Sequence, residues 1–335
     1  MKPITLKEIA DQLNISISTV SRALSDHPRI SRTTKQAVQA LAKELNFQPN
    51  PLAMNLRMQR TQTIGVIVPK ISYAFYASAI TGIEAIAIRE GYNIVICQSN
   101  ESYEQEVANI KSLLLSRVDG VIVSLAGETK QYDHFQEVLN RGVPLVFFNR
   151  VCPELPVSQV VIDNFSAAAQ AVSSLIQHGY QRIGLLAGPS TIEISNERLR
   201  GYQQMLAQHQ LPFDPSLVAH CDYSESDGYD QTVHLLQLPN PPNAIFAVSD
   251  RLAIAALQAL RDRDIRIPED IALVGFNNDP VTAVVSPPLT TIDQNPEQMG
   301  ETAAHLLFQQ LCDSKTDIEQ VVLKTQLLER NSVKK

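Results

Sequence analysis

The sequence lacks any run of eighteen apolar residues, which excludes an expected transmembrane helix. Its first residues hold no apolar stretch before a small-residue cleavage site, so we expect no secretory signal and a cytoplasmic protein with no membrane partner. Four cysteines, Cys97, Cys152, Cys221 and Cys312, are far apart and match no zinc or redox spacing. We expect them to be reduced thiols in or near the core.

Several signatures of catalysis are also missing. No glycine-rich phosphate fingerprint follows any expected strand, of either the dinucleotide or the P-loop kind. No nucleophile with a paired base is recognisable, and the seven histidines suggest no metal cluster. We therefore expect a protein that is not an enzyme and that needs no cofactor and no metal.

The charge is distributed unevenly along the chain. The 335 residues carry a net charge of −7, which by itself argues against nucleic acid. Residues 1–60, however, contain nine Lys or Arg against four Asp or Glu, a net charge of +5, which leaves −12 for the remainder. A basic head on an acidic body is typical of a DNA-binding module fused to a domain of another kind.

The head contains the start signals of three helices. Thr5 followed by Glu8 is a capping box, and Ser16 and Ser31 are good N-caps for two further helices. The helix that Ser16 caps is expected to run to about Leu24. Asn14 suits the left-handed turn between the first two helices. The residues that we expect to face inward are Leu6, Ile9, Ala10, Leu13, Val20, Ala23, Leu24, Ala37, Val38, Leu41, Ala42 and Leu45.

This pattern indicates a helix-turn-helix, whose second helix lies in the major groove of DNA. Arg22 is the natural guanine reader because its guanidinium can donate twice to one base. Ile17 and Ser18 stand at the start of the same helix and are expected to meet base edges. The alternatives are that Arg22 is an ordinary solvated residue and that Ile17 belongs to the core.

A short helix is also expected near residue 50. Asn50 can cap it, Pro51 suits its first position, and Leu52, Ala53 and Leu56 form one apolar stripe. Two turns are not stable alone in water, so DNA and a second copy of the segment are expected to order it. Leu56 would then wedge between base steps from the minor groove. The alternative is an ordinary linker.

Together these motifs resemble the LacI–GalR family of bacterial transcription regulators. The resemblance rests on Thr19-Val-Ser-Arg22 and on Asn50-Pro-Leu-Ala with Leu56-Arg57, and it extends to about Arg330. It implies major-groove contacts by the residues matching Ile17, Ser18 and Arg22, and intercalation by the residue matching Leu56 at the centre of a palindromic operator. The expected DNA-binding residues are Thr5, Ser16, Ile17, Ser18, Thr19, Ser21, Arg22, Arg29, Asn50, Leu52, Ala53, Leu56 and Arg57.

From Thr63 onward, β-branched runs alternate with helical stretches, which predicts parallel sheets covered by helices on both faces. The alternation starts a second time near Val160, so we expect two similar subdomains with a cleft between them. The predicted strands are 64–69, 93–97, 120–124, 145–149, 160–163, 183–187, 218–221, 244–248 and 272–276.

Ligands of open parallel sheets bind outside the carboxyl ends of the strands. Polar and aromatic residues follow these strands: Ser72, Ala74, Phe75, Tyr76, Asn149-Arg150, Asp163-Asn164, Ser195, Arg198, Ser249-Asp250 and Asn277-Asn278-Asp279. Such a set suits a polyhydroxylated ligand. Each residue also has an ordinary alternative: Asp163-Asn164 or Ser249-Asp250 as helix caps, Arg198 in a surface salt bridge, and Phe75 and Tyr76 in the core.

The family resemblance extends to this region, because Ser195-Asn-Glu-Arg-Leu-Arg-Gly-Tyr202 is similar to the family's effector segment. It implies that the arginine matching Arg198 contacts the ligand. The chain departs from the family with Asn149, Ser249 and Asn277, where Asp, Asn and Asp are frequent, so an acidic or phosphorylated ligand is repelled less. The expected effector residues are Ser72, Phe75, Tyr76, Asn149, Asp163, Ser195, Arg198, Asp250 and Asn277.

The expected architecture is an all-α helix-turn-helix head, joined by a hinge helix to an α/β periplasmic-binding-protein-like core of two doubly wound parallel-sheet subdomains. We expect the head over 1–47, the hinge over 48–60 and the effector-binding and dimerisation domain over 61–335. Its first subdomain takes about 61–160 and 292–321, and the second about 161–289 and 322–331. The tail has no leucine heptads, which favours a homodimer over a coiled-coil tetramer.

The expected function is a sequence-specific DNA-binding regulator, as a repressor, whose operator affinity is set by a sugar or sugar derivative. Its partners are a palindromic double-stranded operator, that effector and a second copy of the chain. The alternatives are a solute-binding protein for sugar uptake, which the basic head disfavours, and a sugar-modifying enzyme.

Overall fold

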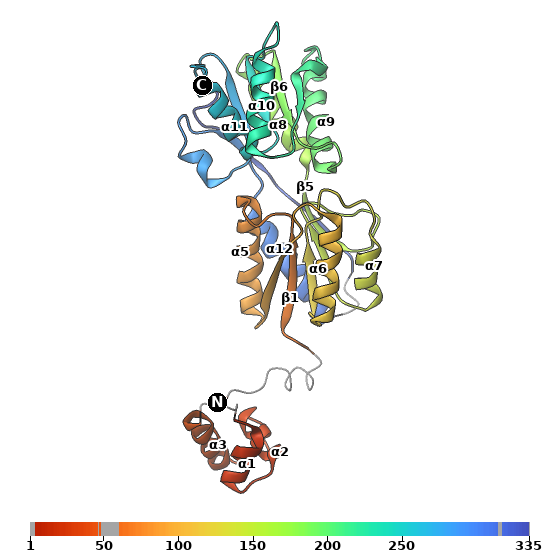
Figure 1. Ribbon diagram of the computed structural model, residues 1–335, viewed down its shortest axis with the longest axis vertical. Helices are drawn as coiled ribbons and strands as arrows, with labels where there is room; N and C mark the ends of the chain where they lie inside the picture. Colours follow the sequence, from red (N-terminus) through yellow and green to blue (C-terminus); the bar gives the residue numbers. More distant parts are fainter. Residues whose placement is uncertain (1–3, 46, 48–59, 314–316, 335) are drawn as a thin grey trace. The chain divides into compact units, whose positions relative to one another are not determined.

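The computed structural model describes residues 4–45, 47, 60–313 and 317–334. The chain divides into two units, Met1–Thr61 and Gln62–Lys335 (Figure 1). The first unit contains α1 (Leu6–Leu13), α2 (Ile17–Leu24) and α3 (Arg32–Glu44). The predicted hinge segment falls on residues 48–59, which lie outside the described residues.

The predicted helix starts in the head are confirmed. Thr5 and Glu8 form the capping box of α1, and Asn14 ends that helix in the left-handed conformation at φ 53°. Ser16 accepts a hydrogen bond from the amide of Thr19 at the start of α2, and Ser31 caps α3 in the same way. Because each cap satisfies a backbone amide that the helix leaves unpaired, local sequence alone decides these boundaries.

A small apolar core joins the three helices. It contains Ile9, Ala10, Val20, Ala23, Val38 and Ala42, and the remaining predicted inward residues except Ala37 pack around it. One prediction was wrong, because Ala37 is exposed. The buried stripe of α3 runs through Val38, Leu41, Ala42 and Leu45, with the spacing of one helical face, and Ala37 precedes it on the solvent side.

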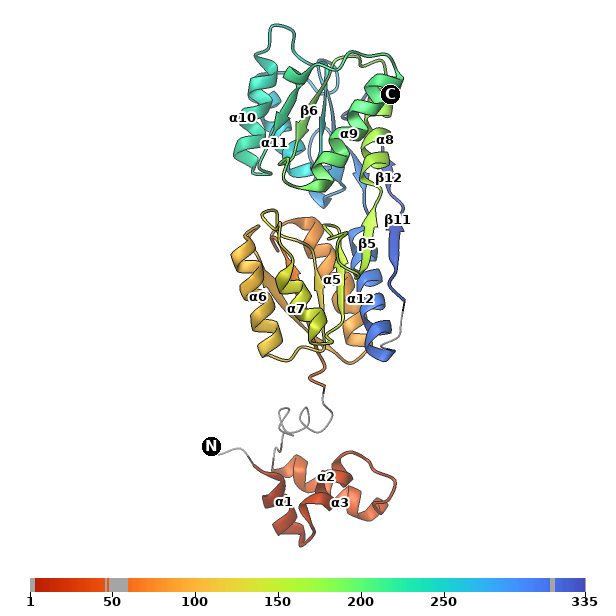
Figure 2. The same cartoon turned by 90° about the vertical axis from the view of Figure 1, so that its right-hand side faces the viewer.

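The second unit contains two six-stranded sheets (Figures 1 and 2). The first has the strand order β11-β5-β4-β3-β1-β2, and all its pairs are parallel. Helices α5 and α12 pack on one face, and α6 and α7 on the other. Its elements are β1 (Thr63–Val68), α5 (Ala74–Arg89), β2 (Asn93–Gln98), α6 (Tyr103–Leu115), β3 (Gly120–Val123), α7 (Asp133–Asn140), β4 (Leu145–Phe148), β5 (Ser158–Ile162), α12 (Pro296–Cys312) and β11 (Gln320–Leu323).

The second sheet has the order β12-β10-β9-β8-β6-β7. Helices α8 and α9 pack together on one face, and α10 and α11 on the other. Its elements are α8 (Asn164–Gln177), β6 (Ile183–Ala187), α9 (Glu193–Gln208), η1 (Pro215–Leu217), β7 (Val218–His220), α10 (Glu225–Leu236), β8 (Ala244–Ala247), α11 (Asp250–Arg261), β9 (Ala272–Asn277), η2 (Pro280–Ala283), β10 (Thr290–Asp293) and β12 (Gln326–Leu328).

The predicted strand–helix alternation is confirmed, with one difference at the carboxyl end of the chain. Strand β12 pairs antiparallel with β10, so the second sheet is not wholly parallel. Strands β10, β11 and β12 were not predicted, because β10 has only four residues, and β11 and β12 are short edge strands whose side chains are mostly exposed or half-buried. Short strands of that kind show no continuous apolar run.

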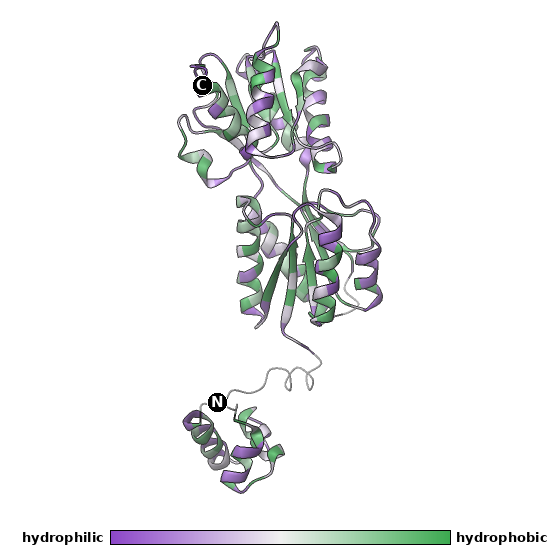
Figure 3. Cartoon of the chain, viewed as in Figure 1, coloured by the Kyte–Doolittle hydropathy of each residue, from purple (hydrophilic) through white to green (hydrophobic). Residues whose placement is uncertain are grey.

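The hydrophobic residues follow the two sheets, and polar residues cover the outer faces of the helices (Figure 3). Three segments connect the subdomains that the sheets define: 162–164, 293–296 and 323–326. In the first subdomain, α5 and α12 cross so closely that a Cβ on Gly82 or Gly300 would overlap with backbone of the opposite helix. Only glycine fits at these two crossing points.

All four cysteines are free thiols. Cys152 and Cys221 are buried and Cys97 is half-buried, as predicted, but Cys312 at the end of α12 is exposed. Within the described residues, no helix is long and apolar enough to cross a membrane.

Candidate functional site

The first candidate site is the exposed side of α2 in the head. Ser16 accepts from the amide of Thr19 at 3.1 Å, and its hydroxyl lies 2.8 Å from the hydroxyls of both Ser18 and Thr19. Ile17 is 48% exposed, so it does not belong to the core. An exposed isoleucine and a row of hydroxyls at the start of a helix offer an apolar contact and hydrogen bonds to a groove edge.

Two arginines of the head are also exposed. The guanidinium groups of Arg22 and Arg29 have no hydrogen-bond or ion-pair partner within the described residues, so both are available to an outside ligand. Ser21 is half-buried, and the Thr5 hydroxyl takes part in the capping box of α1. The predicted residues Asn50, Leu52, Ala53, Leu56 and Arg57 lie outside the described residues.

The second candidate site is a cavity between the two subdomains of the core. Residues at the carboxyl ends of the strands of both sheets line it, as the strand-end rule predicts. The centres of water molecules can occupy about 50 Å³ of it, which is room for a few ordered waters. The lining residues are Tyr73, Phe75, Tyr76, Asn149, Arg150, Ile194, Arg198, Tyr223, Ser249, Arg251, Asn277, Asp279 and Gln294.

Five of the nine predicted effector residues line this cavity, namely Phe75, Tyr76, Asn149, Arg198 and Asn277. The other four do not. Ser72 is exposed in the loop before α5. Asp163 is exposed and caps α8, accepting from the amide and the hydroxyl of Ser166 at 2.8 and 2.6 Å.

Ser195 and Asp250 lie behind the wall and support it. The Ser195 hydroxyl is 2.7 Å from the Tyr223 hydroxyl, and both groups are buried. Asp250 is fully buried, where it accepts from the amide of Asp279 at 2.7 Å and from the hydroxyl of Thr291 at 2.7 Å. These two residues therefore hold the lining residues Tyr223 and Asp279 in position.

Aromatic rings form one side of the cavity. Phe75 and Tyr76 pack edge to face with centroids 5.2 Å apart, and both also belong to the core. The Tyr76 hydroxyl lies 3.2 Å from the Ser124 hydroxyl and accepts from the Asn149 amide at 3.2 Å. Burial raises the pKa of Tyr76, so this hydroxyl stays neutral. Flat apolar faces beside polar groups suit a ring with hydroxyl substituents.

Two buried arginines form another side. Arg198 is 3% exposed, donates to the carbonyl of Val248 at 2.6 Å and to the Asn164 side chain at 2.9 Å, and its guanidinium stands 3.8 Å from the centre of the Phe276 ring. The surface salt bridge considered for Arg198 is thus excluded. Burial lowers its pKa to about 10, which still leaves it charged at neutral pH.

Arg150 donates to the Glu101 carboxylate at 2.6 Å, and Glu101 also accepts from the amide of Gly127 at 2.7 Å. Burial alone would lower the pKa of Arg150, but the nearby Tyr76 and Glu101 raise it. Its Nε atom is buried and has no partner within the described part of the chain. An unpaired buried donor costs free energy that a bound ligand can recover.

Asp279 lines the cavity, and Asp250 lies behind its wall. Burial, together with the neighbouring Asp279, raises the pKa of Asp250 to about 7. Burial also raises the pKa of Asp279 to about 6, although Arg251 acts in the opposite direction. The Asp279 carboxyl faces the cavity without a side-chain partner among the described residues, so it can accept from a ligand.

The lining also contains Arg150, Ser249 and Asp279, which follow predicted strands but were not among the predicted effector residues. Five further lining residues were not predicted: Tyr73, Ile194, Tyr223, Arg251 and Gln294. Tyr223 follows β7 and Gln294 follows β10, so the strand-end rule would have found both. The Gln294 side chain donates to Asn277, and its own oxygen is buried without a partner among the described residues.

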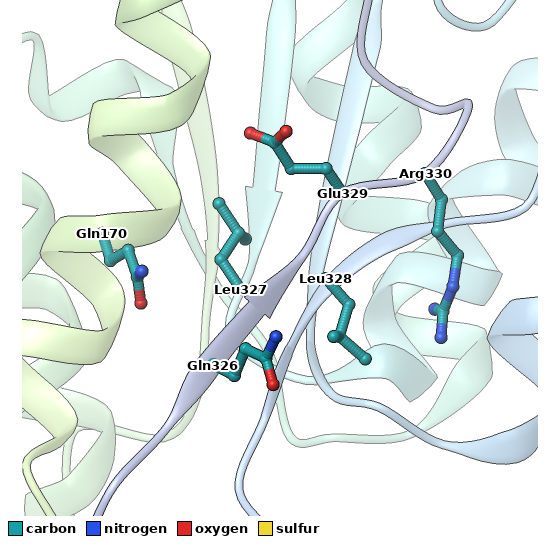
Figure 4. Close-up of a pocket in the computed structure, with 6 residues that line it drawn as sticks. All are labelled: Gln170, Gln326, Leu327, Leu328, Glu329 and Arg330. Carbon is teal, nitrogen blue, oxygen red and sulfur yellow. The ribbon is translucent and has the colours of Figure 1, made fainter.

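A second, open depression lies beside β12 (Figure 4). Its lining residues are already engaged, since Glu329 accepts from Ser174 and Arg330 donates to Thr282, Leu289 and Asn278. It therefore offers a ligand less than the central cavity does. The described residues contain no group of three or more His, Cys, Asp or Glu side chains that could hold a metal ion.

Comparisons with known proteins agree with a DNA-binding head joined to a ligand-binding core. Residues 5–50 match the family model described as bacterial regulatory proteins, lacI family, and residues 172–333 match a periplasmic binding protein-like domain. The HTH-type transcriptional repressor CytR of Escherichia coli (strain K12) is 35% identical over 307 residues, which cover 92% of this chain and 89% of CytR. The chain belongs to the LacI family of bacterial regulatory proteins.

Solved structures extend the match over both units of this LacI-family chain. The transcriptional regulator CelR in complex with cellobiose aligns with a TM-score of 0.75 and 31% identity, over 98% of this chain and 99% of that one. The lac repressor dimer bound to operator and the anti-inducer ONPF aligns with a TM-score of 0.88 and 26% identity, over 99% of both chains. The predicted family and fold class are thus confirmed, and the chain is a DNA-binding transcription regulator.

Proposed function

We propose that this LacI-family chain is a cytoplasmic, homodimeric repressor whose affinity for a palindromic operator is set by a small carbohydrate-like effector in the core cavity. The observation that carries the proposal is the central cavity, which combines aromatic faces with unpaired polar groups. Ligand-binding sites typically have this composition. The head supplies the second requirement, an exposed helix with a row of hydroxyls and with an arginine, Arg22, whose guanidinium has no partner among the described residues.

In the head, α2 would occupy the major groove of each half-site. Arg22 would donate to a guanine, and Ile17 and Ser18 would meet the neighbouring bases. Ser16, Thr19, Ser21, Thr5 and Arg29 would contact the backbone and hold the helix in register. Leu56 of the hinge segment, with Asn50, Leu52, Ala53 and Arg57, would enter the minor groove at the operator's centre.

In the core, the effector ring would lie against Phe75 and Tyr76, and Asn149, Asn277 and Arg198 would bind its polar groups. Asp250 and Ser195 would act through the lining residues they position, and Ser72 and Asp163 would approach the ligand only after a rearrangement.

The fold provides a route for that change. Three short segments, 162–164, 293–296 and 323–326, connect the subdomains, so a rotation about them would widen the cavity without disturbing either sheet. The effector would bind one arrangement more tightly and so shift the population of the dimer between DNA-binding states. The structures of CelR with cellobiose and of the lac repressor with operator support this assignment by similarity.

The test is an operator-binding titration with full-length protein. An operator is first selected from random duplexes, and its affinity is then measured with and without a panel of sugars and sugar derivatives. The proposal requires one specific sequence and at least one compound that changes its affinity. Equal binding to all duplexes would refute it.

A further inference from the structure

The lining of the core cavity holds more positive than negative charge. Three guanidinium groups line it, those of Arg150, Arg198 and Arg251, against a single carboxyl group, that of Asp279. Behind the wall, Glu101 pairs with Arg150 at 2.6 Å, and the burial of Asp250 opposes its ionisation.

Arg198 is the cation whose charge the protein leaves uncompensated. No carboxylate oxygen of the described residues lies within 4.0 Å of it, and its partners are a backbone carbonyl, an amide oxygen and the face of an aromatic ring. The other two arginines differ, because Arg150 has Glu101 and the half-exposed Arg251 lies 3.5 Å from Glu225. Burying a charge without a counter-ion is costly unless a ligand supplies one.

The polar groups near these arginines offer no substitute for that counter-ion. Asn149 and Asn277, which share the lining with Arg198, carry neutral amides. The buried Nε of Arg150 also lacks an acceptor within the described residues. Two buried guanidinium groups on one cavity therefore leave a donor unpaired and a positive charge unbalanced.

Two other groups of the lining have the complementary deficit. The Asp279 carboxyl and the buried Gln294 oxygen are acceptors without donors among the described residues. Hydroxyl groups of a ligand can satisfy acceptors of this kind, and a carboxylate or phosphate can satisfy the arginines. The lining therefore suits one molecule that carries both hydroxyl groups and an anionic group.

We propose that the effector is an anionic sugar derivative whose carboxylate or phosphate is bound by Arg198 and Arg150, while its hydroxyls donate to Asp279 and Gln294. The inference deepens the proposed function and depends on the core cavity being the effector site. Its test uses full-length protein at constant ionic strength, since surface charges would otherwise contribute.

The first arm uses inorganic phosphate as the probe and chloride as the reference in thermal unfolding. Phosphate should raise the melting temperature of the wild type above that in chloride, since binding to the native state stabilises it. Arg198→Met should lose this shift. Arg182→Met is the matched control, because Arg182 is a partly buried arginine that is paired with Asp214 outside the cavity, and it should keep the shift. Equal shifts in wild type and Arg198→Met, or no shift beyond chloride in the wild type, would overturn the inference.

The second arm is calorimetry with matched sets: glucose, glucuronate and glucose 6-phosphate, and the same three forms of galactose. An acid or a phosphate should bind at least tenfold more tightly than its neutral sugar, and the better of the two identifies the anionic group. Where Arg198→Met fails to fold, Asn277→Asp takes its place, since an added carboxylate in the lining should weaken the anionic ligand by a larger factor than its neutral counterpart.

A neutral sugar that binds as tightly as its acid and its phosphate contradicts the inference. If that neutral sugar also changes operator affinity, the proposed function stands and only the charge assignment fails. If ligands bind the cavity but none changes operator affinity, the proposed function fails instead.

Discussion

Replacement of Arg22 by alanine should weaken operator binding and relax sequence preference while leaving the head folded. The structure supplies the reason, because the guanidinium of Arg22 is exposed and has no partner within the described residues, so its loss removes no internal contact. The small core of Ile9, Val20 and Val38 is untouched by the change. The entire effect should therefore appear at the DNA.

The magnitude follows from the symmetry of the operator. A bidentate arginine–guanine pair contributes roughly 1–3 kcal/mol of discrimination. A dimer that contacts two half-sites loses this twice, roughly 2–6 kcal/mol, which weakens specific binding between about 30-fold and about 10⁴-fold. Binding to random DNA should fall far less, because it depends on charge alone.

The assay is fluorescence anisotropy with the selected operator and with a scrambled duplex, at one fixed salt concentration. Arg32→Ala is the matched control, since Arg32 is an exposed arginine of the same head and is not among the expected DNA-binding residues. This control should weaken both duplexes alike and keep their ratio. An Arg22→Ala protein that also keeps the ratio would show that Arg22 reads no base.

Three other predictions concern the core and the hinge. Because burial raises the pKa of Asp279 to about 6, the native state binds this proton more tightly than the unfolded chain, so its ionisation lowers stability as pH rises from about 4 to 6. Asp279→Asn should make the fall in melting temperature over this range smaller, and the fall that remains comes from Asp250, whose pKa is also raised; a fall equal to that of the wild type would contradict this. Gly300→Ala should destabilise the core by roughly 1–3 kcal/mol, because the added Cβ overlaps with the carbonyl of Ala79. His305→Ala, on the exposed side of the same helix, should not destabilise it. A urea unfolding midpoint of Gly300→Ala equal to that of the wild type would count against the prediction. Leu56→Gly should reduce specific binding and DNA bending without changing effector affinity. Unchanged bending in a circular-permutation gel would show that Leu56 does not insert between base steps.

The head was predictable from local signals. Thr5, Ser16 and Ser31 begin the three helices, and each does so through a hydrogen bond within its own first turn. The strands of the core were predictable because parallel strands buried on both faces appear as continuous β-branched runs. Strand β12 was not predicted because its pairing with β10 is a long-range contact, and its three residues, one exposed and two half-buried, show no apolar run.

The cavity was predictable as a place but not as a full set of residues. Arg198 and Asn277 follow strands and meet there, as the topology requires. Asp163 also follows a strand, yet its side chain turns to the amide of Ser166 and caps a helix instead. An aspartate at a strand end can line the cavity or cap a helix. Its side-chain geometry decides between these two roles, and the spacing of residues in the sequence does not reveal that geometry.

The most direct test of the account is a thermodynamic cycle between the two units. Operator affinity is measured on full-length protein with and without a saturating ligand of the core cavity, and ligand affinity is measured with and without operator. Coupled sites require the two ratios to be equal and to differ from one, by roughly 5-fold to 150-fold for typical allosteric proteins. Ratios of one in both directions would show that a ligand bound in the core does not control the DNA-binding head.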